Sequence, residues 1–88
     1  MDEKQSLLKF PCQFPVKAMG RPESGFELKA LTIVKRHAID FEDENMKTVS
    51  SRKGNYRSVT FVINATSQDQ LDALYRELTA CDELLMVL

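Results

Sequence analysis

The chain has 88 residues, of which 43% are hydrophobic and 28% charged, and its formal net charge is −1. A single domain of this length buries only about 60–65% of its unfolded surface, so nearly every segment must contribute to the core. The balanced charge gives no general attraction to nucleic acid, and no apolar run approaches the ~20 residues that cross a membrane. An acidic start is atypical of a signal peptide. We expect one cytoplasmic domain over residues 1–88, with residues 1–10 as a flexible N-terminal segment.

The segment Phe10–Gly20 is predicted to form the first strand. Its apolar residues alternate before a glycine that favours a turn: Phe14, Val16 and Ala18. Pro11 and Pro15 lack the backbone N–H that a strand donates to its neighbour. They indicate either an irregular start of the strand or a strand whose early portion is unpaired on one side.

From Pro22 the sequence period changes to that of a helix. Pro22 suits the first turn of a helix, and Glu23 favours the positively polarised N-terminus. The residues that share one face of this helix are mainly apolar: Phe26, Ala30, Ile33, Val34 and His37. We expect the acidic run Asp40–Asn45 to end the helix as a loop.

Two strands joined by a hairpin are expected next. The segment Asn45–Ser51 is polar and β-branched, which is typical of an edge strand. The segment Ser58–Asn64 alternates like an inner strand with one buried face. Between them, Gly54 followed by Asn55 predicts a type II′ turn.

Pattern alone leaves the register of this hairpin open. A two-residue loop places Arg52 opposite Arg57, and directly opposed like charges are unfavourable. A three-residue loop over residues 53–55 instead pairs Val49 with Val59.

The last two elements are a helix and a short strand. Ser67 and Gln70 have the spacing of a capping box at the start of the helix. Apolar residues recur along one side of it: Leu71, Leu74, Tyr75 and Leu78. The run Glu83–Leu88 is too short for another helix and fits a strand covered on both faces, by helices or by another subunit.

This order of elements predicts an α+β protein with the ferredoxin-like βαββαβ fold. Because such crossovers are right-handed, both helices should pack on one face of a four-stranded antiparallel sheet.

Four stretches of the sequence resemble the YbeD-like family of bacterial proteins: FPCQFPVKAMG, SSRKGNYRSVTFVINA, LDALYREL and LLMVL. The resemblance extends over nearly the whole chain in the same order. It implies a ferredoxin-like fold similar to the small-molecule-sensing ACT domains of amino-acid enzymes. Members are sometimes labelled lipoate-regulatory, a label that rests on genome context. The family has no agreed catalytic residues, so none is transferred to this chain.

The predicted topology gathers cations at one end of the molecule, which we call the upper end. The turn after the first strand, the start of the first helix and the hairpin should meet there, beside the connection after the second helix. Helix N-termini favour anions, and a glycine permits close approach of a ligand. We expect a carboxylate or phosphate to bind Gly20, Arg21, Arg52, Lys53 and Arg57. The alternative is that these cations are ordinary solvated surface and that the glycines serve turn geometry.

The opposite, lower end should hold the acidic loop and both chain termini. That loop lacks the ligand spacing and the glycine of a calcium site, so no metal is expected there. His37 falls near a helix end without a nucleophile and is read as structural. Cys12 and Cys81 should lie about 20 Å apart along a strand, too far for a mutual disulfide. We expect no catalytic residue and no cofactor.

The sheet face away from the helices suggests two further kinds of partner. It should carry Met19, Val62 and either Leu85 or Val87, an apolar surface that a second copy or a partner enzyme could cover. RNA-binding domains share this topology, but here only Tyr56 is a free aromatic candidate for base stacking.

We therefore predict a non-enzymatic regulatory or adaptor domain that senses a small anionic metabolite or docks onto a metabolic enzyme. The alternative is an RNA-binding module that uses the sheet face and the basic hairpin. Nucleic acid is the less favoured partner because of the acidic balance of the chain.

Overall fold

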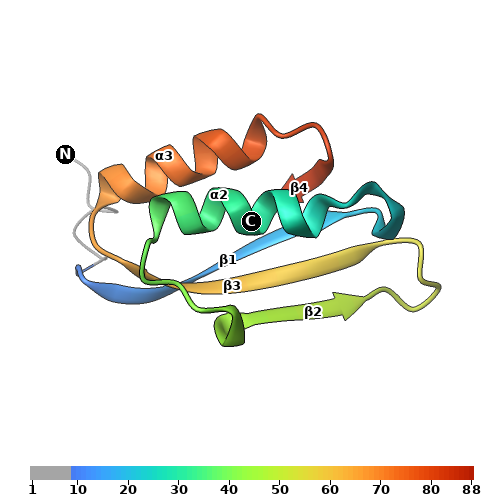
Figure 1. Cartoon of the computed structure of the whole chain (residues 1–88), viewed down its shortest axis with the longest axis horizontal. Coiled ribbons are helices and arrows are strands. Elements are labelled where there is room, and N and C mark those ends of the chain that lie inside the picture. The colour runs from blue at the N-terminus through green and yellow to red at the C-terminus, as the bar shows by residue number, and fades with distance from the viewer. Residues whose placement is uncertain (1–8) are drawn as a thin grey trace.

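The computed structural model describes residues 9–88. The elements along the chain are β1 (Cys12–Gly20), α2 (Phe26–His37), β2 (Met46–Ser50), β3 (Arg57–Ala65), α3 (Gln68–Thr79) and β4 (Leu84–Val87). The strands form one antiparallel sheet in the order β2-β3-β1-β4, and both helices cover the same face of it (Figure 1). The predicted ferredoxin-like α+β fold is confirmed.

The core lies between this face of the sheet and the two helices. The alternating residues Val59, Phe61 and Ile63 of β3 are fully or almost fully buried, and Val16 of β1 pairs with Phe61. The predicted helical stripes supply the other half of the core: Phe26, Ala30, Ile33 and Val34 from α2, with Leu71, Leu74 and Leu78 from α3. Periodicity of 2 and of 3.6 residues therefore identified the core correctly.

The N-terminal ten residues fall mostly outside the described part of the chain. Residues 1–8 of the segment that was predicted to be flexible lie outside the described residues. Phe10, by contrast, is partly buried and packs against the core. The ordered domain therefore includes the end of the segment that was predicted to be flexible.

Among residues 9–88, no strand pairs with one side of the first half of β1, which is one of the two arrangements that Pro11 and Pro15 indicated. The backbone N–H and C=O of Lys17 both bond to Leu88, at 3.1 and 2.7 Å, so the chain ends opposite the middle of β1. The backbone N–H and C=O groups of every second residue point to the same side of a strand. The backbone nitrogen of Pro15 therefore points to the same side as that of Lys17, at a level that β4 does not reach. The prediction that both termini lie at the lower end is wrong for the C-terminus, because β4 is too short to reach it.

The first helix begins later than predicted. Pro22–Ser24 form a single 3₁₀ turn, and the hydroxyl of Ser24 donates to the carbonyl of Arg21 at 2.8 Å. Gly25 then adopts a left-handed conformation with φ of 74°, and α2 starts at Phe26. A left-handed residue interrupts a right-handed helix, so Pro22 starts the 3₁₀ turn and not the α-helix.

The hairpin between β2 and β3 has a longer loop than either predicted register allows. Ser50 pairs with Arg57, and the N–H of Ser51 donates to the carbonyl of Tyr56 at 2.8 Å. The N–H of Gly54 donates to the carbonyl of Ser51 at 3.0 Å, with Gly54 at φ of 73°. Serine at the first position and glycine at the fourth position are typical of a type I turn. The predicted type II′ turn at Gly54 and Asn55 is therefore wrong.

The last strand is covered on one face only. A bulge opposite Met19 and Gly20 shifts the register, so that Met86 pairs with Met19 and Val87 with Ala18. Val87 therefore faces the helices, while Leu85 and Met86 are about half exposed. Within the described chain the helices cover one face of β4 only, so cover of its other face by another subunit stays a prediction. The open face carries Met86 in addition to the predicted Met19 and Val62.

Candidate functional site

The structure brings the predicted basic residues to one end of the molecule. Gly20 pairs with Arg57 at the end of the sheet, and the guanidinium of Arg21 lies 5.8 Å from the centre of the Tyr56 ring. Arg52 and Lys53 are exposed at the tip of the hairpin. The hairpin, the end of β1 and the start of α2 all lie at the same end (Figure 1). The expected placement is therefore correct, whereas ligand binding by these residues stays a prediction.

Arg57 already has an anionic partner within the chain. Its Nη1 lies 2.5 Å from Oε2 of Glu27, in the first turn of α2, and the Glu27 side chain is only 19% exposed. The helix N-terminus favours that carboxylate for the same reason that it would favour a ligand. Sequence periodicity did not identify Glu27, because the pairing depends on how α2 crosses β3. The pair reduces the net positive charge of the upper end.

Gly20 is explained by packing. A Cβ at this position would lie 2.6 Å from Cγ of Phe26 and 3.0 Å from the carbonyl oxygen of Glu83. Phe26 is fully buried, so its ring occupies the space that any side chain at residue 20 would need. A close approach does require this glycine, and the approaching group is Phe26 of the same chain.

The open face of the sheet has an unusual charge distribution. The residues that alternate with buried ones point away from the helices: Gln13, Pro15, Lys17 and Met19 of β1, Lys47 and Val49 of β2, Ser58, Thr60, Val62 and Asn64 of β3, and Met86 of β4. None of these strand positions is acidic. Two acids lie at its lower margin: Glu44 lines a hollow with Lys47 and Val62, and Asp40 contacts Asn64 at 3.5 Å.

Lys17 and Lys47 stand on either side of Thr60 in the same row across the open face. Among residues 9–88, neither lysine forms an ion pair. A neighbouring row is largely apolar and contains Val49, Met19 and Met86, with Ser58 between the first two. The open face thus combines an apolar row with two lysines that form no ion pair within residues 9–88.

The basic residues of α2 differ, because each of them contacts an acid, although Arg76 of α3 has no ion pair among the described residues. Four contacts join basic groups of α2 to acids: Lys29–Glu83, Lys35–Asp43, Arg36–Glu77 and His37–Glu77. The bond from Lys29 is the main cause that lowers the pKa of Glu83 and raises that of Lys29. A groove of about 350 Å³ between the helices is lined by both Lys29 and Arg36, but each already contacts a carboxylate.

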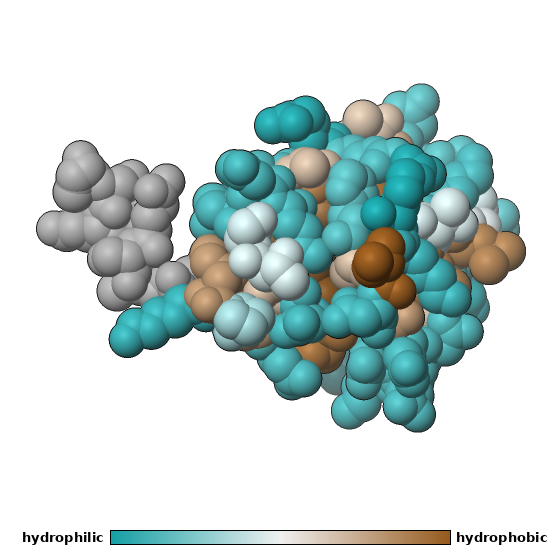
Figure 2. Space-filling model, turned by 60° about the vertical axis from the view of Figure 1, so that its left-hand side comes forward, coloured by the Kyte–Doolittle hydropathy of each residue, from teal (hydrophilic) through white to brown (hydrophobic). Residues whose placement is uncertain are grey.

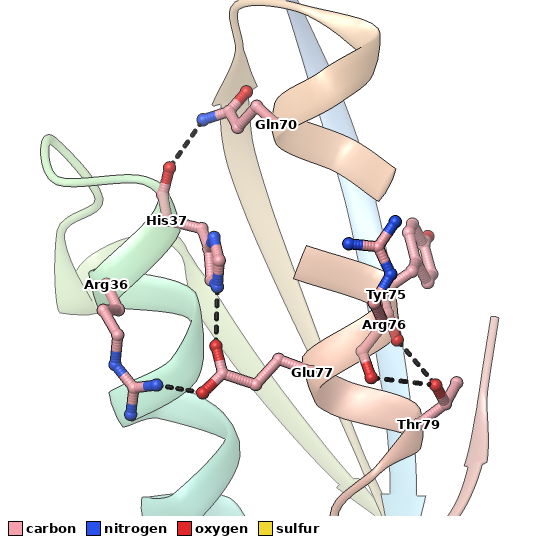
Figure 3. A network of polar contacts seen from close by, with 7 residues as sticks. All are labelled: Arg36, His37, Gln70, Tyr75, Arg76, Glu77 and Thr79. Atoms are coloured by element: carbon pink, nitrogen blue, oxygen red, sulfur yellow. Dashed lines mark hydrogen bonds and ion pairs between the residues drawn. The ribbon is translucent and has the colours of Figure 1, made fainter. Parts of the chain in front are cut away.

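A polar network ties the two helices together near the end of α2 (Figure 3). His37 Nε2 lies 2.6 Å from one oxygen of Glu77, and Arg36 binds the other oxygen. The bond from His37 is the largest cause of a lowered pKa of Glu77. Gln70 donates to the backbone carbonyl of His37 at 2.8 Å. His37 thus joins the two helices through Glu77, and its structural role stays a prediction.

No group of three histidine, cysteine or acidic side chains among residues 9–88 is arranged to hold a metal ion. Cys12 and Cys81 are both free and partly buried, with the thiol of Cys81 3.4 Å from Glu83. None of the helices in the described range is both long enough and apolar enough to span a bilayer.

The end of the molecule opposite the hairpin is mostly hydrophilic. Figure 2 turns this end towards the viewer and shows a largely teal surface with separate brown patches. The acids of the connection between α2 and β2 are exposed there, as predicted, and Asp43–Asn45 form a 3₁₀ turn within that loop. Ile39 in the same connection is 90% exposed. The acidic loop therefore lies at the end opposite the basic hairpin.

Comparison with known proteins gives the family of the chain. Residues 5–88 match the model of a protein family of unknown function, DUF493. The chain belongs to this family. UPF0250 protein NE1487 of Nitrosomonas europaea is 48% identical over 75 residues, which cover 85% of this chain and 86% of that protein. A UPF0250 protein of Neisseria gonorrhoeae is 40% identical over 87 residues, which cover 99% and 96% of the two chains. The predicted resemblance to uncharacterised YbeD-like bacterial proteins is confirmed.

A solved structure supports the fold of this DUF493 protein. The solution structure of protein HP0495 from H. pylori matches with a TM-score of 0.70 over 99% of this chain and 91% of that one. The two sequences are only 12% identical, so the likeness concerns the fold alone.

Proposed function

We propose that this DUF493 protein is a non-catalytic adaptor domain that binds an acidic surface of a partner protein through the open face of its sheet. The observation that carries the proposal is the contrast between the two sides. Lys17 and Lys47 on the open face have no ion pair within the described residues, whereas the two lysines and the arginine of α2 each contact an acid. Charges of complementary sign across an interface speed association and select partners.

The apolar row supplies the other ingredient of a protein interface. Val49 and Met86 are 61% and 49% exposed, and both lie in the same row as Met19. Protein interfaces are enriched in methionine and place apolar contacts inside a polar rim. The hairpin cations Arg52 and Lys53 add positive charge at the end of β2 that is nearer to this row.

Two other ligands receive less support. Single-stranded RNA requires exposed rings on which bases stack, and the outward positions of the four strands carry no aromatic residue. Phe14 faces Tyr75 of α3, with ring centres 6.5 Å apart, so it packs on the helical side. A small anion at the upper end would compete with Glu27 for Arg57.

Site-specific photo-crosslinking in the bacterium tests the proposal. A photoreactive residue at position 60, between the two lysines, should capture a protein, and one at position 72, on the exposed side of α3, should not capture the same protein. The captured protein is then purified and its affinity is measured by calorimetry for the wild type and for the double variant Lys17→Glu, Lys47→Glu.

We expect the double variant to bind at least tenfold more weakly, and the affinity of the wild type to fall as salt is raised. Arg76→Glu is the matched control, since Arg76 is exposed on α3 and has no ion pair among the described residues. Unchanged affinity in the double variant, or crosslinking at position 60 only to RNA, would contradict the proposal.

A further inference from the structure

The outer edge of β2 is free in the described part of the chain. β2 is an edge strand of the sheet and, among the strands, pairs only with β3. Every residue of it except Met46 is exposed. Proteins normally protect such an edge with prolines, bulges, several charges or a covering segment. β2 contains only one charged residue, Lys47, and no proline. An exposed strand edge of this kind is suited to pair with another strand.

The backbone pattern shows which groups of β2 are available. Lys17 directs its N–H and C=O towards Leu88 and thus away from its partner Thr60. Thr60 must then direct its groups towards β2, where it is paired with Lys47. Because the direction alternates along a strand, three residues of β2 point their backbone groups outward: Met46, Thr48 and Ser50.

The two ends of β2 carry charges of opposite sign. Three acids precede the strand, Glu42, Asp43 and Glu44, and two cations follow it, Arg52 and Lys53. Glu44 and Arg52 are equally distant in sequence from Thr48, as are Asp43 and Lys53. Asp43 is already joined to Lys35, whereas neither Glu44 nor Arg52 has an ion pair among residues 9–88.

We infer that two copies of this chain pair through their β2 strands, antiparallel and centred on Thr48. A two-fold axis at this position makes the interface self-complementary. Thr48 then exchanges backbone bonds with the partner's Thr48, and Met46 with the partner's Ser50, so that every outward group of the strand is used. The same arrangement places the acidic turn that holds Glu44 at the same end of the interface as the partner's hairpin, which holds Arg52. A parallel arrangement would bring acids to acids and cations to cations.

Side chains are compatible with this register. Lys47 lies beside the partner's Val49 on the open face, so its aliphatic stem can cover a residue that is 61% exposed in the single chain. No like charges are opposed within the paired strands. The two sheets become one continuous sheet with all helices on one side, and the two open faces join into one surface. The inference does not depend on what binds that surface.

A charge exchange between two copies tests the pairing. Sedimentation equilibrium should show that the full-length wild type is a dimer that weakens as salt is raised. Glu44→Arg alone and Arg52→Glu alone should each raise the dissociation constant about tenfold, because each single variant brings like charges together twice in the dimer. Glu44→Arg combined with Arg52→Glu in one chain should restore the wild-type value.

Mixing the two single variants gives the most selective readout. In a mixed dimer, the arginine introduced by Glu44→Arg faces the glutamate introduced by Arg52→Glu, and the unchanged Arg52 and Glu44 face each other. Native mass spectrometry should therefore find the mixed dimer in excess over both homodimers. A wild type that remains monomeric at a concentration of several hundred micromolar would overturn the inference. So would a statistical mixture of the variants, or a double variant no better than the singles, with circular dichroism confirming that all chains are folded.

Discussion

At Gly20, one hydrogen atom separates the backbone from the ring of Phe26. Adding a methyl group there would place a carbon 2.6 Å from that ring, well inside van der Waals contact. We expect Gly20→Ala to lower the free energy of unfolding by about 1–3 kcal/mol, the usual cost of overpacking a core. Urea denaturation followed by circular dichroism measures this change.

A smaller side chain at residue 26 provides the control for this prediction. Phe26→Leu itself weakens the core, but it makes room beside residue 20. In that background Gly20→Ala should cost clearly less than in the wild type, since contacting residues are not additive. An equal cost in both backgrounds would show that the contact with Phe26 is not what requires glycine.

The lowered pKa of Glu77 should make the stability of the fold depend on pH in the acid range. Its bond from His37, with a contribution from Arg36, lowers its pKa below the ordinary glutamate value of 4.5. A carboxyl group whose pKa is lower in the folded state stabilises the fold at pH above its unfolded pKa. That contribution is lost as pH falls through the lowered pKa. We expect Glu77→Gln to reduce the midpoint of thermal unfolding at pH 6 and to leave it nearly unchanged near pH 2.

Thermal scans across this range should therefore show a shallower acid dependence for Glu77→Gln than for the wild type. Glu42→Gln is the matched control, because Glu42 is exposed and without an ion pair in the part of the chain described. It should retain the wild-type slope. A parallel shift of the whole curve in Glu77→Gln would assign Glu77 a packing role.

At the scale of elements, α3 begins with a cap that the sequence predicted in part. The hydroxyl of Ser67 accepts from the N–H of Gln70 at 3.1 Å, as in a capping box. The side chain of Gln70 returns to the N–H of Thr66, one residue earlier than in that motif, and also reaches the carbonyl of His37. One side chain thus ties the start of α3 to the end of α2.

This geometry predicts different costs for two serines. Ser67→Ala should lower the free energy of unfolding by about 1 kcal/mol, because it leaves a helix N–H without its partner. Ser50→Ala, at an exposed strand position, should stay within about 0.5 kcal/mol of the wild type. Chemical denaturation of both variants measures the difference. Equal effects would mean that the cap does not stabilise α3.

Elements whose apolar residues repeat regularly could be predicted from the sequence. Element boundaries that depend on backbone conformation and on hydrogen bonds within turns could not. The stripes of both helices and the alternation of β3 follow from burial on one face, which sequence records directly. The start of α2 depends on the left-handed Gly25, and the hairpin register depends on bonds from Ser51. Many glycines and serines make no such contact, so their presence alone does not reveal the turn.

At the scale of the whole molecule, the predicted topology correctly placed the basic residues at one end. That an acid of the same chain pairs with one of them could be seen only in the structure. Arg57 belongs to β3 and Glu27 to α2, and their pairing follows from how the helix crosses the sheet. Met86 on the open face was missed because the bulge beside Gly20 reverses the alternation of β4. Charge on the open face was overlooked since Lys17 and Lys47 are far apart in sequence.

The charge of the upper end leads to a final prediction about anions. Arg57 is already paired with Glu27, so the wild type should bind inorganic phosphate only weakly, through Arg21, Arg52 and Lys53. Glu27→Gln removes the competing carboxylate and leaves Arg57 uncompensated, which should strengthen phosphate binding several-fold. The readout is an NMR titration of the amide signals of Gly20 and the hairpin. Glu77→Gln, which removes one charge at a distant ion pair, is the control and should not change the affinity. If Glu27→Gln leaves the affinity unchanged or lowers it, Arg57 does not contribute to anion binding, and the cations of the hairpin are ordinary surface.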